Sequence, residues 1–444
     1  MLSVLPGLIW SLGCEATVGS IDVSDDSSDS ANTPDDTGRE DVPGVAEVLP
    51  VLVIATSDDI GSEKVAGTLE VVEVHEGDPE DIDDAPRSLV TDIGIEVHGS
   101  SSQGYPKLGY RMETRDEDGD DENHSLLGLS SGSDWVLHAP YSDKTLVRNA
   151  LSYGLGSLIS EAYQPGTRFV ELILNDRYRG VYVVVERIRR GRIELTDPEE
   201  DVTGAYIVRI DQHRNEGWNT TVGTPIDWYQ PRYEDITSAQ DTYLRGWFND
   251  FEAAMSKDDF ADTYEDWIVT DEWIDHFLVN ELSHNIDAYR LSAYLYKDAE
   301  ADGGKLHAGP LWDFDRAYGN VNYCDCWYAE GWIIDSLIDC GEGWQFPFWW
   351  RRLEQDPAYQ EAVDCRWEAL RAEHFSDAAL EEHIRGLVVE IGEAEERDHD
   401  RWDVIGQYID PNYYVGDTYE DEIDWLIEWT HQRAEWMDSE LVCD

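Results

Sequence analysis

The stretch "GPLWDFDRAYGN", residues 309–320, places two aspartates, Asp313 and Asp315, on either side of a phenylalanine. In an extended segment, residues i and i+2 point to the same side, so we expect the two carboxylates to converge. Two converging carboxylates repel each other unless a cation lies between them, and their oxygens suit magnesium or calcium. The stretch therefore indicates a metal site; the alternative is a turn in which both aspartates cap backbone N–H groups.

A second polar segment lies upstream, in "ELSHNIDAYRLSAYLYKD", residues 281–298. An apolar helical pattern ends there, and Asp287 follows before a strand-like run. In phosphoryl transfer by protein kinases, one aspartate orients the attacking hydroxyl and a later aspartate holds magnesium on the phosphates. The order of Asp287 and then Asp313 favours such a site, and a turn cap is the alternative for Asp287.

The first half of the chain is rich in strand patterns. Apolar runs and alternations bounded by Gly, Asp and Pro predict strands within residues 48–57, 67–74 and 92–99. A small-residue loop, "GSSSQGYPK", joins the third of these strands to the next. Its N–H and O–H groups could hold phosphates, and cations on the following strand would neutralise them. The candidate phosphate-binding residues are Gly99, Ser100, Ser101, Lys107 and Arg111. An ordinary hairpin turn with surface ion pairs is the alternative.

A helix and a hairpin follow this loop. Residues 140–160 fit a helix with Ser142 or Asp143 as its N-cap. Residues 167–190 fit a hairpin that turns at residues 175–177. In this helix, Leu146, Ala150, Leu151 and Leu158 should lie near one face.

Helical periodicity dominates the chain beyond residue 235. The strongest patterns cover residues 271–285, 348–373 and 420–441. We therefore expect an α+β fold, with a β-rich lobe over about residues 47–190 and a helix-rich lobe over about residues 191–444.

The charge of the chain is strongly acidic. Its 96 Asp and Glu residues face 32 Lys and Arg residues, which gives a formal net charge of −64. Such a field repels a phosphate backbone, so nucleic acid is excluded as a partner. An acid excess of this kind suits a high-salt habitat, where ions screen the repulsion between carboxylates.

The N-terminal residues indicate export. Residues 1–14 form an apolar run as long as a signal-peptide core and too short to span a bilayer. Cys14 resembles the lipid-attachment site of bacterial lipoproteins, although Ser11 stands where leucine is usual. Residues 15–46 are rich in Asp, Ser and Thr and predict a disordered acidic linker to a domain over residues 47–444. We expect a monomer whose membrane link is a lipid on Cys14.

Five further cysteines suggest disulfides. The chain contains no CxxC motif or nearby histidine pair that would complete a zinc site, and an exported protein meets an oxidising environment. Sequence alone leaves the pairing open, and an odd number leaves one thiol over. The five residues are Cys324, Cys326, Cys340, Cys365 and Cys443.

Over about residues 90–440 the chain resembles the CotH kinase family, which has an atypical protein-kinase-like fold. The resemblance rests on "GSSSQGYPKLGYRMET", "DWVLHAPYSDKTLVRNAL", "RFVELILNDRYRGVYVVVERI", "NIDAYR" with "YLYKD", and "GPLWDFDRAYGN". It implies a bilobal fold that binds ATP and magnesium. The chain departs from the family pattern at Leu108, where a second basic residue is frequent, and at Ser292, where an asparagine could help to hold a second metal ion.

The resemblance also implies residue roles. Asp287 falls at the catalytic aspartate, Asp313 at the magnesium ligand, and Asp315 at a second ligand. The basic strand with Lys107 and Arg111 should face the nucleotide phosphates. The strand that ends near Glu186 should lead to the hinge, where backbone groups receive adenine. These six residues, with Gly99, Ser100 and Ser101, form the expected site.

The expected function is an exported, surface-tethered phosphotransferase that moves the γ-phosphoryl group of ATP to Ser or Thr hydroxyls of proteins. Aspartates and cations without a Ser-His-Asp or Cys-His arrangement suit phosphoryl transfer, which needs positioning and charge neutralisation. Since ATP is scarce outside cells, the alternative is a non-catalytic surface binding protein or adhesin on a kinase-like scaffold.

Overall fold

The structure is a computed structural model, and it describes residues 48–73, 78–80, 82, 84–198, 201–212, 216–343 and 346–443. The expected signal peptide, Cys14 and the acidic linker lie outside the described residues, so their assignment stays a prediction.

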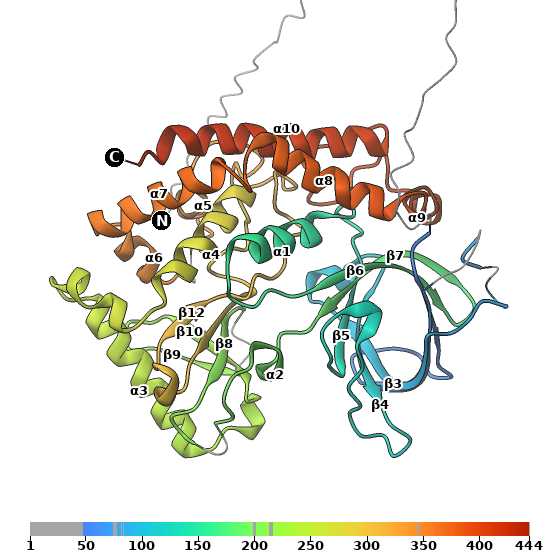
Figure 1. Ribbon diagram of the computed structural model, residues 1–444, viewed down its shortest axis with the longest axis horizontal. Helices are drawn as coiled ribbons and strands as arrows, with labels where there is room; N and C mark the ends of the chain where they lie inside the picture. Colours follow the sequence, from blue (N-terminus) through green and yellow to red (C-terminus); the bar gives the residue numbers. More distant parts are fainter. Residues whose placement is uncertain are drawn as a thin grey trace, which may run out of the picture. The chain divides into compact units, whose positions relative to one another are not determined.

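Seven strands of the N-terminal part form a closed barrel (Figure 1). The strand order is β1-β2-β3-β4-β5-β7-β6, and a parallel pair between β1 and β6 closes the barrel. Residues two apart on a strand point to the same side, and several such pairs fill the barrel core, for example Ile93 and Ile95 of β3. Asp92, next to Ile93, is exposed. The strands are β1 (Val51–Ala55), β2 (Val65–Val72), β3 (Leu89–His98), β4 (Gly109–Arg115), β5 (Asp134–His138), β6 (Thr167–Leu174) and β7 (Tyr178–Glu186).

A second sheet lies in the part of the chain that we expected to be mainly helical. Its strand order is β12-β11-β8-β10-β9, and every pair is antiparallel. Sequence reasoning found only the run after Asp287, because the other strands are short and give weak periodicity. The strands are β8 (Tyr206–Ile210), β9 (Gly217–Asn219), β10 (Pro225–Gln230), β11 (Ala293–Lys297) and β12 (Leu306–Ala308).

The α-helices gather in the C-terminal part, so the expected α+β class is confirmed. In Figure 1, α10 runs along one side of the described fold, next to α8 and close to α4. Residues 348–373 form two helices because Pro357 begins a new one behind its N-cap Asp356. The α-helices are α1 (Arg148–Ile159), α2 (Arg190–Ile193), α3 (Ser238–Met255), α4 (Thr270–Ser283), α5 (Ile333–Asp339), α6 (Phe348–Leu353), α7 (Pro357–Arg371), α8 (Asp377–Ile391), α9 (Ala394–Trp402) and α10 (Tyr419–Glu440). Short 3-10 turns are η1 (Ser101–Gly104), η2 (Leu126–Gly128), η3 (Tyr233–Asp235), η4 (Phe260–Asp262), η5 (Tyr264–Asp266) and η6 (Glu300–Asp302).

Helix α1 joins the barrel to the helical part, because it follows β5 and packs on α4 and α8. It begins later than the sequence predicts, with Val147 as its N-cap in place of Ser142 or Asp143. The Asp143 carboxylate instead accepts hydrogen bonds from the backbone N–H (2.9 Å) and the guanidinium (2.5 Å) of Arg148, which holds the preceding residues in a turn. Leu158 near the C-terminus of α1 is 48% exposed, whereas Leu146, Ala150 and Leu151 are buried.

Two disulfides cross the helical part and resolve the cysteine pairing. Cys324 pairs with Cys340, and Cys365 pairs with Cys443. Cys326 is a buried free thiol. The expectation of disulfides is therefore confirmed, and Cys326 is the thiol left over. Within the described residues, no helix combines the length and apolarity that a bilayer crossing requires.

A histidine in the second sheet should make stability depend on pH. The ring of His307 lies between Glu272 (2.6 Å) and Asp298 (2.8 Å). Burial alone would lower the pKa of His307, but hydrogen bonds to Asp298 and Glu272 outweigh it and raise the pKa to about 9. A group whose pKa rises on folding stabilises fully below its unfolded pKa, so this stabilisation is present below about pH 6.5 and is lost as the pH rises through about 9.

We expect His307→Gln to flatten the stability profile over that range. The shift in pKa corresponds to a stabilisation on the order of 3 kcal/mol. Urea denaturation at about pH 6 and about pH 9.5 checks this. The wild type should lose more of its unfolding free energy than the variant between the two values, and parallel losses would contradict the assignment.

Candidate active site

A cavity of about 130 Å³ lies where the ends of β3 and β5 face the segments that follow α4 and β12. Three kinds of residues meet there: a loop of glycine and serines, three carboxylates, and an apolar wall with Val136, Val185 and Trp312. A larger hollow of about 700 Å³ near β9 and β10 has no ionisable side chain among the described residues that line it. The smaller cavity is the candidate site because the glycine and serine loop meets the three predicted aspartates there.

Asp313 and Asp315 both reach this cavity, although their segment is not extended. Asp313 has a left-handed backbone with φ of 69°, so the expected strand geometry was wrong. This conformation costs free energy in a non-glycine residue and must be held by neighbours. The backbone N–H of Asp313 donates to the Tyr153 hydroxyl (3.1 Å), and Ser292 donates to the Asp313 carboxylate (3.2 Å).

Asn149, near the start of α1, clamps the same segment. Its side-chain oxygen accepts a hydrogen bond from the Phe314 N–H (2.7 Å), and its side-chain nitrogen donates to Asp315. Arg148 beside it donates to the carbonyl of Ala317 (3.2 Å). Helix α1 therefore fixes the aspartate segment from the barrel side. Sequence reasoning predicted the helix and missed this role, because Asn149 lies 165 residues before Phe314 and no local pattern connects them.

The three carboxylates repel one another electrostatically. Burial, together with the charges of Asp315 and Asp287, raises the pKa of Asp313 to about 7. Burial also raises the pKa of Asp287, although Arg316 and Arg290 oppose this effect. Burial would raise the pKa of Asp315 as well, but His138, 3.1 Å away, holds it below its usual value.

This donor set fits a divalent cation. Among the described residues that line the cavity, the cationic groups near the carboxylates are Arg316 and His138. His98 also lines the cavity, but burial and the charge of Arg111 lower its pKa to about 3, so it is neutral at pH 7. Oxygen ligands that are buried and mutually repelling suit magnesium.

Asp287 is placed to accept a proton or a hydrogen bond from a ligand. It is 9% exposed, and its Oδ1 is a buried atom without a hydrogen-bond partner in the described part of the chain. Its backbone N–H donates to Asn285, whose side chain also donates to the carbonyl of Asp313 (3.4 Å). Asn285 therefore links the Asp287 segment to the metal-binding segment.

The small-residue loop faces the carboxylates. Gly99, Ser100 and Ser101 all line the cavity, as sequence reasoning expected. Gly99 has φ of 105°, and a Cβ atom there would lie 2.1 Å from the Ser102 hydroxyl, so the turn requires glycine. Arg316 donates to the Ser101 hydroxyl (3.2 Å) and thereby spans the cavity from the aspartate segment to the loop.

Three expected site residues have other partners. The ammonium of Lys107 is fully buried 2.6 Å from Asp398 on α9, and Lys107 does not line the cavity. Arg111 pairs with Glu96 on the neighbouring strand, and its charge lowers the pKa of His98, which lines the cavity.

The Glu186 carboxylate is also engaged outside the cavity, whereas its neighbour Val185 lines it. Its hydrogen-bond donors are Ser130, Tyr163 and the N–H of Gly166. The geometry therefore favours two other cations in place of Lys107 and Arg111. Arg316 would face a phosphate bound at the serine loop, and His138 contacts Asp315. Arg316 directly follows the "WDFD" motif, so a sequence signal for it was present; His138 gave none.

Comparison with known proteins identifies the chain. The family model described as CotH kinase protein matches residues 95–437, which include the glycine and serine loop and all three aspartates. A search of curated proteins found no match to the chain. Because the family match spans most of the chain, the expectation drawn from its motifs is confirmed: this protein belongs to the CotH kinase family.

Proposed function

We propose that this protein is an exported phosphotransferase that depends on ATP and magnesium and acts on Ser or Thr hydroxyls of proteins. The observation that supports it is the meeting of Asp287, Asp313 and Asp315 with the Gly99–Ser101 turn in one cavity of a CotH kinase family member. In this proposal the barrel and the helical part correspond to the two lobes of a kinase-like fold.

The proposed roles follow from the contacts. Asp313 and Asp315 would hold the magnesium ion, which neutralises charge on the transferring phosphoryl group. The serine loop would hold phosphates through its N–H and O–H groups, and Arg316 would neutralise them. The apolar wall with Val136, Val185 and Trp312 offers a surface for a nucleotide base.

Asp287 would orient the acceptor. Its Oδ1 has no hydrogen-bond partner in the described part of the chain, so a substrate hydroxyl can donate to it without displacing another donor. The carboxylate would then fix the direction in which the hydroxyl oxygen attacks, as the catalytic aspartate does in protein kinases.

The proposal is tested by calorimetry of ATP binding to the wild type with and without magnesium, together with transfer of labelled phosphate to casein or to the protein itself. Magnesium-dependent ATP binding and transfer support the kinase. A wild type that binds no nucleotide at any magnesium concentration would leave the alternative, a surface binding protein or adhesin on a kinase-like scaffold.

The proposed cell-surface location has its own test. If Cys14 carries a lipid, Cys14→Ser should move the protein from the membrane fraction to the soluble fraction, because the acyl chains provide the anchor. Fractionation followed by immunoblotting measures this, and thermal denaturation of the released protein should match that of the wild type. A variant that stays in the membrane fraction rules out the Cys14 anchor.

A further inference from the structure

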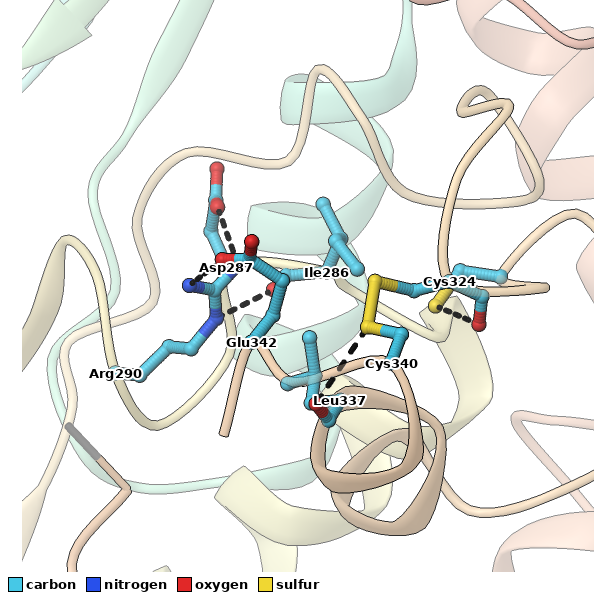
Figure 2. The surroundings of a disulfide bond; sticks show 8 residues. Ile286, Asp287, Arg290, Cys324, Leu337, Cys340 and Glu342 are labelled. Carbon is cyan, nitrogen blue, oxygen red and sulfur yellow. Dashed lines mark hydrogen bonds and ion pairs between the residues drawn. A yellow bond between two sulfur atoms is a disulfide. The ribbon is translucent and has the colours of Figure 1, made fainter. Parts of the chain in front are cut away.

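Arg290 connects the Asp287 carboxylate to a segment that a disulfide holds (Figure 2). The arginine is 3% exposed, and its guanidinium lies 3.9 Å from Asp287 Oδ1. Its Nε donates to the carbonyl of Ile286 (3.2 Å), and its Nη1 donates to Glu342 (3.4 Å). Arg290 therefore contacts both the backbone and the side chain of the Asp287 segment and is itself held from outside by Glu342.

The Cys324–Cys340 disulfide fixes the residues on both sides of this contact. Glu342 lies just beyond Cys340, and its backbone N–H donates to the carbonyl of Leu337 (2.8 Å) at the end of α5. Tyr323 directly precedes Cys324, and burial together with the charge of Asp287 raises the pKa of its hydroxyl. Each half of the disulfide is thus within two residues of a neighbour of the Asp287 site.

We propose that Arg290 is a positioning residue for Asp287 and that the Cys324–Cys340 disulfide keeps Arg290 in place by fixing Glu342. The proposal rests on the proposed phosphotransferase function. Without Arg290, the Asp287 carboxylate loses the cation that lies 3.9 Å from its Oδ1, and its segment loses the link to Glu342, so the carboxylate would turn away from the acceptor. A displacement of about 1 Å in a catalytic group can cost roughly 10²-fold in rate.

The second disulfide provides a matched control. Cys365 on α7 pairs with Cys443 after α10, and neither residue lines the candidate site. It closes a longer loop, with a sequence separation of 78 against 16 for Cys324–Cys340. In the chain-entropy model, removal of the longer loop costs at least as much stability. If removal of Cys324–Cys340 lowers turnover more than removal of Cys365–Cys443, the cause is therefore the place of the first disulfide beside Asp287 and not a loss of stability alone.

The experiment compares four variants, all carrying Cys326→Ser so that this free thiol cannot pair with Cys324 or Cys340. They are Arg290→Met, Arg290→Lys, the pair Cys324→Ser with Cys340→Ser, and the control pair Cys365→Ser with Cys443→Ser. We expect Arg290→Met to lower kcat roughly 10²-fold, and Arg290→Lys to recover part of it. The Cys324/Cys340 pair should lower kcat roughly tenfold and the control pair should leave it unchanged. The Kd for magnesium–ATP should stay within about threefold of the background throughout.

Two outcomes overturn the proposal: equal losses of kcat in both disulfide variants, or a loss of nucleotide affinity that parallels the loss of kcat. Amide hydrogen exchange over residues 284–292 gives a reading that does not depend on catalysis. Exchange should be faster in Arg290→Met and in the Cys324/Cys340 variant than in the control pair. Unchanged exchange contradicts positioning even if no kinase activity is found. If the wild type transfers no phosphate but exchange is faster in these two variants, the positioning role is supported and only the phosphotransferase function is contradicted.

Discussion

Asp287→Asn should reduce phosphoryl transfer at least about 10²-fold while the affinity for magnesium–ATP stays within about threefold of the wild type. An asparagine keeps the size of the side chain and removes the charge that orients the acceptor hydroxyl. It does not touch the two aspartates proposed to hold the metal. The variant should therefore bind nucleotide and fail in the chemical step, which calorimetry and labelled-phosphate transfer measure in parallel.

Asp313→Asn should behave differently, because it removes charge from the proposed metal ligands. We expect magnesium-dependent ATP affinity to fall about tenfold or more, since even the loss of an outer contact in a metal site costs roughly 10- to 100-fold. Turnover should fall with it. The magnesium dependence of ATP binding should weaken in Asp313→Asn and remain in Asp287→Asn. Asp313 would then be needed for nucleotide binding, and Asp287 only for the chemical step.

Asp176→Asn supplies the matched control for both substitutions. Asp176 is exposed in the β6–β7 turn and has φ of 57°, a conformation that asparagine accepts readily. It should bind and transfer like the wild type. If Asp287→Asn and Asp313→Asn lower the melting temperature and leave both nucleotide affinity and phosphoryl transfer unchanged, both residues are turn caps and the assignment of the site is wrong.

Periodic patterns made most of the fold predictable. The strands of residues 48–57 and 92–99 and the hairpin that turns at residues 175–177 appear as β1, β3 and β6–β7. The patterns could not predict that the sheet closes into a barrel. Closure depends on the pairing of β1 with β6, which lie more than a hundred residues apart, and no local rule predicts that pairing. The second sheet was missed for the same reason, because its short strands gain stability from distant partners.

The candidate site was predictable where function is concentrated in short motifs. The glycine and serine loop, Asp287, and the "WDFD" aspartates all carry turn or charge signals that survive without tertiary context, and all reach the cavity. The positions of the cationic side chains were harder to predict. A lysine or arginine on a strand can point to either side of the sheet, and in so acidic a chain it can pair with any of many carboxylates. Lys107 meets Asp398, nearly three hundred residues later, which no spacing argument could anticipate.

Arg433→Met should lower the free energy of unfolding by about 3–5 kcal/mol, the largest stability loss that we expect from one substitution. Arg433 on α10 is fully buried and donates to the carboxylate of Glu281 (3.1 Å) and to its carbonyl (2.7 Å). It also donates to the carbonyls of Ala329 (2.9 Å) and Gly331 (2.6 Å). Methionine keeps the apolar stem and removes the only arginine partner of the buried Glu281 carboxylate that the described residues show, together with one donor to each of the three carbonyls.

Two comparisons isolate the cause. Arg385→Met removes an arginine that pairs with exposed carboxylates on the surface of α8 and α10, so it should cost less than about 1 kcal/mol. Adding Glu281→Gln to Arg433→Met should restore part of the loss, because no charge then remains buried alone. Urea denaturation of the three variants measures these differences, with equal m values as the check that each unfolds from a comparable fold.

The pH dependence of the Arg433→Met loss provides a further check. Burial already raises the pKa of Glu281 to about 7, although Arg433 opposes that effect. Without Arg433 the pKa should rise further, so Glu281 stays protonated to a higher pH in the variant than in the wild type. A carboxyl group whose pKa is raised on folding loses stability from its unfolded pKa up to its folded pKa. Wild type and variant should therefore lose stability in parallel up to about pH 7, and the difference between them should grow from about pH 7 to about pH 9. A loss that is the same at both values would show that the missing carbonyl hydrogen bonds, and not the unpaired charge, account for the destabilisation.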